Sequence, residues 1–229
     1  MKLYYKQYET PFVSDSLFTV LVVENAKDFY SLQYDLHLQV SGDGSTFSLS
    51  NHKGLLNIEK ELDWIKSPWD LELNGRKIIV NLYTHLATMF QENGMEFLLL
   101  QKWTELQDLL FDAFVDESSV VMNNEVVGLQ PLLKAFEVKL EDSMAKPFVE
   151  RIMDYCLAKI RFEGKKLFIF NQALAYLETD DIIELIHFCE AEEICFLSLE
   201  RQLPPHNDKL RGRCLVLDQD LCEILVRES

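Results

Sequence analysis

The spacing of apolar residues divides the chain into an α/β beginning, a helical middle and an α/β end. Residues 17–23 form a continuous apolar run, which is typical of a strand buried on both faces of a sheet. Asn25 is a candidate N-cap for a helix that follows this strand. The turn at 41–45 precedes a predicted short strand at 46–50. The predicted helix has its apolar positions at near-helical spacing, at Phe29, Leu32, Leu36 and Val40.

The middle of the chain has a helical period. Apolar positions from Arg76 to Gln91 predict one long helix, and the Asn93-Gly94 turn follows it. We therefore expect two long antiparallel helices, packed on each other or on partner chains. A third helix is predicted from Lys146 to Arg161. The second long helix carries alternating spacings of four and three at Leu99, Trp103, Leu106, Leu110 and Ala113.

The end of the chain returns to an α/β pattern. Strands are predicted at 165–170 and 194–199, and a helix capped by Thr179 lies between them. Such a β-α-β unit predicts neighbouring parallel strands, and a last short strand is predicted at 214–217. The sequence thus predicts a discontinuous α/β head domain, residues 1–75 and 165–229. A helical leg domain, residues 76–164, is inserted into it.

The charge of the chain restricts how it could bind nucleic acid. The net charge is −16, with 38 acidic and 22 basic residues, and an acidic surface repels phosphate. Any contact with DNA must therefore come from locally clustered Lys and Arg. The five cysteines contain no CxxC pair, and we find neither a signal peptide nor a membrane-length apolar run. We expect a cytoplasmic protein with reduced thiols.

The chemistry of ATP hydrolysis is missing from the place where this pattern would put it. A phosphate-binding loop after the first buried strand needs glycines and a Lys. Residues 24–28 read Glu-Asn-Ala-Lys-Asp and contain no Gly. The strand at 165–170 ends at the uncharged Asn171, where such ATPases carry a metal-positioning Asp. The sequence therefore argues against an ATPase.

A metal-dependent nuclease is the main enzymatic alternative. Glu163-Gly-Lys165 and Glu137-Val-Lys139 match half of a common nuclease signature, in which carboxylates hold Mg²⁺ and a Lys lies near the attacking water. A chain so rich in Glu, Asp and Lys should contain about two or three such triplets by chance. Asp180-Asp181 could also pair on a metal, although a helix start accounts for them as dipole partners.

Three segments together resemble a known family. The end of the chain contains KKLFIFNQALAYLETDDIIELIHFCEAEEICFLSLE, in which a Lys-led strand, an acidic helix and a second strand follow one another. Upstream stand NHKGLLNIEKELDWIKSPWDLELNGRKIIVNLYTHLATMFQEN and LLKAFEVKLE. In order and spacing, these blocks resemble the type II-A CRISPR-associated adaptation protein, the Csn-two family in its short form.

The resemblance implies a ring-shaped homotetramer that takes part in CRISPR spacer acquisition. The family's head resembles an inactive P-loop ATPase, and double-stranded DNA ends thread the ring. The partners that the resemblance implies are the adaptation integrase and the type II effector nuclease. The protein would not be an enzyme. A protein-interaction module that never touches DNA is a third class. The candidate DNA-binding residues of the inner wall lie in or near the matching blocks: Lys53, Lys60, Lys66, Arg76 and Lys77. Arg211 and Arg213 form a weaker alternative patch.

The resemblance also implies calcium at the subunit contacts. The corresponding segment here reads FVDESSVVMNNEV, which is less dense in acidic residues than the family pattern. Ca²⁺ prefers six to eight oxygen ligands, usually with several carboxylates. Glu141 and Asp142 could complete the set. The candidate metal ligands in the segment are Asp116, Glu117, Asn123 and Glu125, with Asn124 as a further carbonyl donor.

Overall fold

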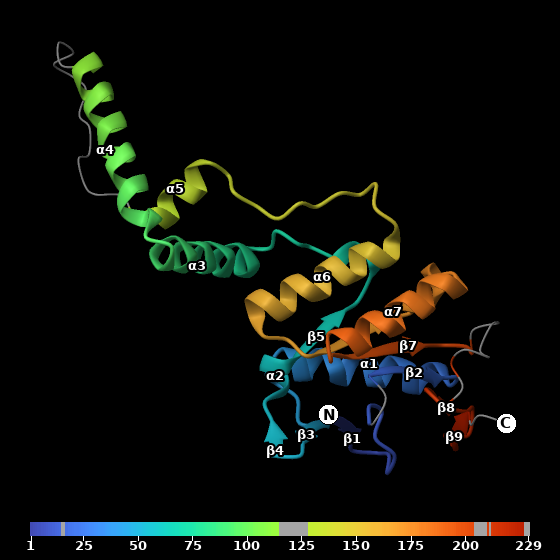
Figure 1. Cartoon of the computed structure of the whole chain (residues 1–229). Helices are drawn as coiled ribbons and strands as arrows, with labels where there is room; N and C mark the ends of the chain where they lie inside the picture. Colours follow the sequence, from blue (N-terminus) through green and yellow to red (C-terminus); the bar gives the residue numbers. More distant parts are fainter. Residues whose placement is uncertain (15–16, 115–127, 204–209, 211, 227–229) are drawn as a thin grey trace. The chain divides into compact units, whose positions relative to one another are not determined.

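The computed structural model divides the chain into two compact units (Figure 1). The larger unit joins Met1–Leu73 to Ser143–Ser229, and the smaller unit is Asn74–Asp142. Each unit is described by itself below. The residues that the structure describes are 1–14, 17–114, 128–203, 210 and 212–226.

A six-stranded sheet forms the centre of the larger unit, with the strand order β5-β6-β7-β2-β8-β9. All neighbouring pairs are parallel except β8 and β9, which are antiparallel. Every residue of β2 and β7 is buried, as the continuous apolar run at 17–23 predicts. The strands are β2 (Phe18–Val23), β5 (Leu62–Ile65), β6 (Leu167–Asn171), β7 (Cys195–Glu200), β8 (Cys214–Leu217) and β9 (Glu223–Val226).

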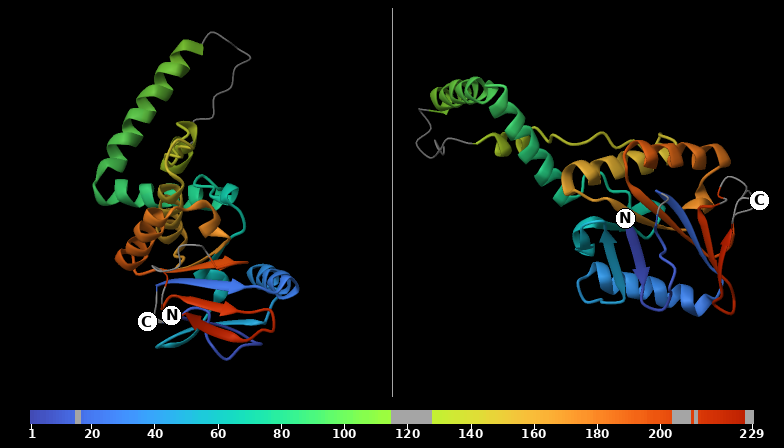
Figure 2. Two further views of the ribbon diagram at one scale, coloured as in Figure 1. Left: turned by 90° about the vertical axis from the view of Figure 1, so that its right-hand side faces the viewer. Right: turned by 60° about the horizontal axis from the view of Figure 1, so that its bottom comes forward.

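Helices cover both faces of this sheet (Figure 2). On one face lies α1 (Ala26–Val40), with Asn25 as its N-cap. On the other face lie α6 (Phe148–Glu163) and α7 (Thr179–Ala191). The predicted β-α-β unit is confirmed, because α7 connects β6 to β7 and these strands pair in parallel. The fold is therefore α/β, as predicted. The described part of the larger unit also contains the short helices α2 (Ile58–Glu61), η1 (Pro68–Asp70) and η2 (Ala173–Tyr176).

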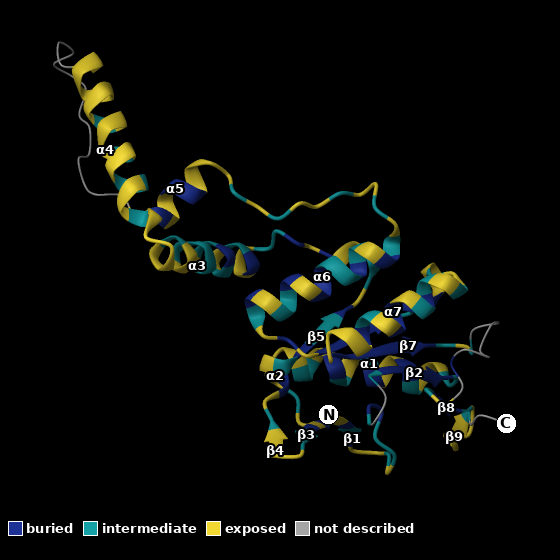
Figure 3. Cartoon of the chain, viewed as in Figure 1, coloured by how far each residue is buried: buried dark blue, intermediate teal, exposed yellow. Residues whose placement is uncertain are grey.

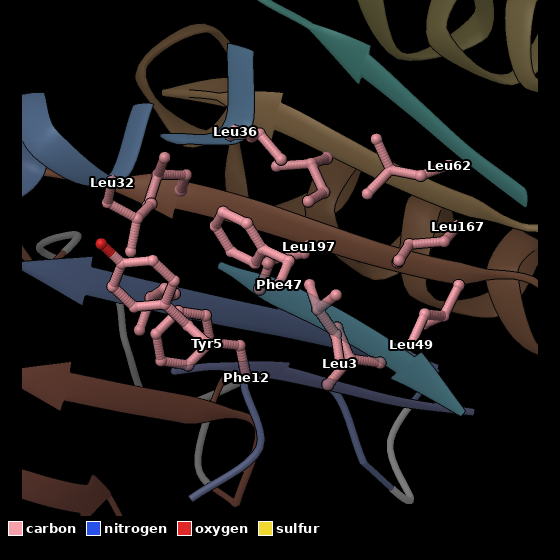
Figure 4. Close-up of a cluster of buried hydrophobic side chains, with 14 of the residues drawn as sticks. Leu3, Tyr5, Phe12, Leu32, Leu36, Phe47, Leu49, Leu62, Leu167 and Leu197 are labelled. Atoms are coloured by element: carbon pink, nitrogen blue, oxygen red, sulfur yellow. The ribbon is translucent and has the colours of Figure 1, made fainter. Parts of the chain in front are cut away.

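A second, three-stranded sheet shares the core on the α1 side. It is antiparallel, with the order β1-β3-β4, and its strands are β1 (Lys2–Tyr5), β3 (Phe47–Asn51) and β4 (Gly54–Leu56). Its inner face packs with α1 and the larger sheet in one apolar cluster (Figure 4). Alternate residues face inward because successive side chains of a strand point to opposite faces. The labelled members of this cluster include Leu3, Tyr5, Leu36, Phe47, Leu49 and Leu167.

The smaller unit is helical. It consists of α3 (Arg76–Glu92), α4 (Met95–Phe114) and α5 (Leu129–Ala135). Ile78 and Leu82 of α3 are buried, as are three leucines of α5. The Asn74 side chain fastens the two ends of the unit: its Nδ2 donates to the Leu140 carbonyl at 3.1 Å, and its Oδ1 accepts from the Leu140 N–H at 2.9 Å.

Helix α4 does not pack along α3, so the first predicted arrangement, two antiparallel helices packed on each other, is not observed, and packing on partner chains stays a prediction. None of its residues is buried, and α4 diverges from α3 beyond the Asn93-Gly94 turn (Figures 1 and 3). Its apolar residues include Phe97 and Leu109 as well as the predicted stripe. Apolar side chains therefore surround much of α4, and a single stripe toward α3 does not account for them.

Two boundaries also differ from those that the sequence predicts. The predicted leg ended at residue 164, but the smaller unit ends at Asp142, and α6 belongs to the larger unit. Ile152 of α6 is fully buried, and the Phe148 ring meets Phe170 of β6 edge-on. The N-cap of α7 is Glu178, which forms a capping box with Asp181, so the prediction of a Thr179 cap is wrong.

Candidate nucleic-acid interface

The outer face of the three-stranded sheet presents basic and hydroxyl side chains. In the β1–β3 ladder, Lys2 lies opposite Ser50 and Tyr4 opposite Ser48. Leu3 and its partner on β3 point into the core, so these two pairs point outward. We call this surface the basic sheet face. It comprises Lys2, Tyr4, Lys6, Ser48, Ser50, His52 and Lys53.

The strands that carry the basic sheet face contain no carboxylate. Residues 1–8 and 44–58 hold neither Asp nor Glu, although the whole chain holds 38 acidic residues. The cations within them are Lys2, Lys6 and Lys53, and all three are exposed. A local excess of positive charge on an acidic protein is the electrostatic footprint that phosphate binding requires.

Lys53 lies at the tip of the β3–β4 hairpin. Its backbone N–H donates to the Asn51 side chain at 2.8 Å, which fixes the turn. Gly54 closes the turn with a φ of 126°, a conformation that L side chains rarely adopt. Beside the turn, Lys2, Ser14, Ser50 and His52 are among the residues that line a hollow of about 420 Å³. Ammonium and hydroxyl groups are the donors that phosphate oxygens accept from.

The structure places the five predicted DNA-binding cations in two units. Lys53, Lys60 and Lys66 belong to the larger unit, whereas Arg76 and Lys77 form the first turn of α3 in the smaller unit. Lys60 precedes β5 and Lys66 follows it, so they lie at opposite ends of this strand. The Lys66 ammonium lies 4.8 Å from the centre of the Trp64 ring, a cation–π distance.

Sequence reasoning missed Lys2 and Lys6. They lie far from Lys53 along the chain, and only the pairing of β1 with β3 brings Lys2 beside the strand that leads to the Lys53 turn. The absence of acidic residues from both segments was visible in the sequence. That absence is the signal that could have identified them.

The predicted calcium ligands Asp116, Glu117, Asn123 and Glu125 lie outside the described residues. Glu141 and Asp142 are both exposed. Within the described part of the chain, no three His, Cys, Asp or Glu side chains form a group that could hold a metal ion.

The nuclease triplet at Glu163 and Lys165 has a structural role. The Lys165 ammonium is buried and donates to the carbonyls of Glu59 and Leu62, at 2.6 and 2.7 Å. The Glu163 carboxylate accepts from Lys159 Nζ at 2.8 Å. These contacts give both side chains a structural role at the junction of α6, α2 and β5.

A polar network beside Glu163 connects α6 to β5. Tyr155 donates to Asp63 Oδ2 at 2.8 Å, and Lys159 Nζ lies 3.5 Å from Asp63 Oδ1. Burial, followed by the charge of Asp63, raises the pKa of the Tyr155 phenol far above its usual range. Because Tyr155 stays a neutral donor, the network fixes α6 on the sheet.

The remaining chemical candidates are exposed or have structural partners. Asp181 belongs to the α7 capping box, which leaves Asp180 exposed beside it. Glu137 has a φ of 51°, and both it and Lys139 are at the surface or close to it. Arg213 binds Glu190 at 2.8 Å, and Arg211 lies outside the described residues.

The turn from β2 to α1 is occupied by the chain's own groups. Asn25 Oδ1 accepts from the Lys27 N–H at 3.0 Å, so a side chain caps the helix start. The Glu24 carbonyl accepts from Arg201 Nη2 and Gln219 Nε2, each at 3.0 Å. With a carboxylate residue and no glycine here, the turn does not form a phosphate cradle.

The four buried thiols are unsuited to nucleophilic chemistry. Cys156, Cys189, Cys195 and Cys214 are buried and form no disulfide, and Cys222 is exposed. Burial raises the pKa of Cys189 and of Cys214 to about 12, so both thiols stay protonated at neutral pH. Among the described residues, no helix is both long enough and apolar enough to cross a membrane.

Comparison with known protein families decides the assignment. The family model for the CRISPR-associated protein Cas_Csn2 matches residues 39–221, which is well over half of the chain. The chain belongs to the Csn2 family. No curated protein matches it in sequence. The family match begins before β3 and ends after β8, so it spans most of both units.

One solved structure shares the fold of this chain. The crystal structure of Stu0660 of Streptococcus thermophilus matches with a TM-score of 0.58 and 12% sequence identity. The match covers 99% of this Csn2 chain and 77% of Stu0660. A bacterial Atm1-family ABC exporter with ATP bound gives 11% identity over 97% of this chain and 37% of the exporter. Its TM-score of 0.38 is too low to carry an argument.

Proposed function

We propose that this Csn2 protein is a non-catalytic double-stranded-DNA-binding protein of CRISPR spacer acquisition, which encircles DNA ends as a homotetrameric ring. The observation that carries the proposal is the basic sheet face, a cationic surface without carboxylates on a protein of net charge −16. Lysine and hydroxyl side chains contact phosphates and read no base sequence, so binding is independent of sequence.

A ring resolves the conflict between the charge of the protein and that of DNA. Four chains sum to 4 × −16 = −64. Such an assembly holds DNA only if its cations face one surface and its anions another. A closed lumen separates them, and DNA that threads the lumen is retained without base readout. The proposed lumen residues are Lys53, Lys60, Lys66, Arg76 and Lys77, joined by Lys2 and Lys6.

The exposed apolar surface of α4 supports assembly with further copies of the chain. Phe97 is 79% exposed and Leu109 is 68% exposed, and the helix has no buried residue at all. Apolar side chains in water are unfavourable by about 25 cal/mol for each Å². A second copy that covers α4 would remove this cost, so we assign α4 to a subunit contact.

Calcium and partner proteins belong to the same proposal. Asp116, Glu117, Asn123 and Glu125 would supply oxygen ligands for Ca²⁺ at a subunit contact. The adaptation integrase and the type II effector nuclease are the proposed protein partners. In this proposal calcium has a structural role, holding subunits together.

Incubation of a labelled linear duplex with the protein and Mg²⁺ or Mn²⁺ tests the proposal. We expect slower migration of the duplex and no shortening. Shortened products would instead support the nuclease alternative. A native mass measurement in Ca²⁺ should give four chains. A tetramer that leaves the duplex unbound would support a protein-interaction module.

A further inference from the structure

A cavity of about 380 Å³ lies in the larger unit, at the carboxyl ends of β6 and β7. It is separate from the basic sheet face. In open parallel sheets, ligands bind outside the carboxyl ends of strands, near the point where successive helices change faces. Here α1 follows β2 on one face of the sheet, and α7 follows β6 on the other (Figure 2). The cavity is therefore at the position where this class of fold binds ligands.

Glu200 presents an unpaired oxygen to this cavity. Glu200 lies at the end of β7, and only 5% of the residue is exposed. Oε1 already accepts from the Leu174 N–H at 2.9 Å and from Ser198 Oγ at 2.6 Å. No described residue donates to Oε2. Burial raises the pKa of Glu200. Oε2 is not among the described polar atoms that are both shielded from solvent and unpartnered, so it is open to the cavity and available to a ligand.

Arg201 provides a second unsatisfied group beside the first. Its Nη2 donates to the Glu24 carbonyl at 3.0 Å, and its guanidinium lies 5.5 Å from the centre of the Phe29 ring. Its Nε is shielded from solvent and has no acceptor among the described residues. The positive charge of the Arg201 guanidinium offsets the negative charge of the Glu200 carboxylate, so the net charge of the cavity lining is close to zero. A charged ligand would be repelled by one group or the other.

The backbone at the cavity is strained as well. Gln172 adopts a left-handed conformation, with φ 59° and ψ 41°, although it is not glycine. Its N–H is fixed by the Leu199 carbonyl at 2.8 Å. Such conformations cost about 1 kcal/mol or more and occur often at ligand sites. The side-chain amides of Gln172 and Gln202 line the cavity and offer both donors and acceptors.

We propose that this cavity binds an uncharged small molecule that presents an N–H donor beside a carbonyl or ring-nitrogen acceptor, as a nucleobase does. The N–H donates to Glu200 Oε2, and the acceptor receives a hydrogen bond from Gln172 or Gln202. Leu174, Ala175 and Leu203 supply apolar walls, which suit a ring. A phosphate is disfavoured by Glu200. A divalent cation is disfavoured by Arg201 and by the lack of three grouped acidic, His or Cys ligands in the described residues.

Titration of the full chain with each of the four 2′-deoxynucleosides tests the site. We expect saturable binding of at least one nucleoside, followed by NMR shifts of the Leu174 and Gln202 amides. Glu200→Gln keeps both accepted hydrogen bonds but replaces the free oxygen with a donor, so it should weaken binding at least about tenfold. Glu192→Gln, at an exposed position, is the matched control and should bind normally.

Ala175→Phe provides an independent variant. Ala175 is exposed at the cavity, so a larger side chain fills the space without disturbing the core, and binding should be lost. The site is refuted if no nucleoside binds, or if binding survives both Glu200→Gln and Ala175→Phe. DNA binding by the basic sheet face is measured separately, so neither result depends on the other.

Discussion

Reversal of two charges on the basic sheet face should change how DNA binding depends on salt. Lys2 and Lys53 are exposed: Lys2 pairs with Ser50 of β3, and Lys53 lies in the turn that follows β3. Each phosphate that a cation neutralises contributes about 0.9 to the slope of log K against log salt. The double variant Lys2→Glu with Lys53→Glu should therefore have a shallower negative slope, reduced in magnitude by about 1.8.

The slope has a direct consequence for affinity. Between about 50 and 200 mM salt, two phosphate contacts account for about a tenfold loss of binding. The parent protein should therefore lose about ten times more affinity than the variant across this range. Repulsion by the new carboxylates lowers the affinity of the variant further at low salt, where the Debye length is longest.

Fluorescence anisotropy of a short labelled duplex measures both quantities. Lys27→Glu is the matched control, because Lys27 is an exposed lysine at the start of α1, outside the basic sheet face. All three positions are exposed, so the free energy of unfolding should stay within about 0.5 kcal/mol of the parent. An unchanged salt slope in the double variant, or an equal change in the Lys27 variant, would refute the assignment of this face.

Further expectations concern assembly, stability and metal. The double variant Phe97→Ser with Leu109→Ser should give species smaller than a tetramer in a native mass measurement, and its circular dichroism spectrum should remain helical. A variant that stays tetrameric would show that α4 does not form the subunit contact. Lys165→Met should lower the free energy of unfolding by about 2 kcal/mol, because two carbonyls lose their donor, and it should leave DNA intact as in the parent. Burial raises the pKa of folded Glu200, so the stability from its protonated form is present at low pH and is lost as the pH rises through the folded pKa. The free energy of unfolding of Glu200→Gln, measured with urea, should therefore rise relative to that of the parent as the pH increases. A difference that stays constant with pH would contradict this. Chelation of calcium should remove roughly 2–4 kcal/mol of stability at saturating metal, and an unchanged melting curve would exclude the site.

The central α/β elements could be predicted because each has a strong local signal. The apolar run of β2 and the Asn25 cap of α1 are both where the sequence places them. The three-stranded sheet was not predicted as a unit, since β1 and β3 are separated by α1 and pair only in the folded chain. The assignment of α6 to the helical leg was wrong for a similar reason. The spacing of its apolar residues predicts a helix, but the residues that it contacts, Asp63 and Phe170, are distant in sequence.

The candidate sites were harder to predict than the fold. The search for positively charged residues in the matching blocks found Lys53 but not Lys2. Lys2 lies outside those blocks, and only the pairing of β1 with β3 brings it onto the same surface. Glu200 gave no sequence signal, since a Glu at the end of an apolar strand is usually solvated. Its burial depends on the Leu174 N–H and Ser198, which the fold brings to it.

The central claim is that the protein encircles DNA, and a comparison of linear with covalently closed circular duplex tests it most directly. Both substrates should have the same sequence and be measured at the same salt concentration. A closed ring loads only where the duplex has an end, so we expect linear DNA to bind and closed circles to bind poorly. Cutting the circle once should restore binding, and bulky caps on both ends should prevent it. Equal binding of circles and linear duplex would contradict threading, and the basic sheet face would then act as an open surface.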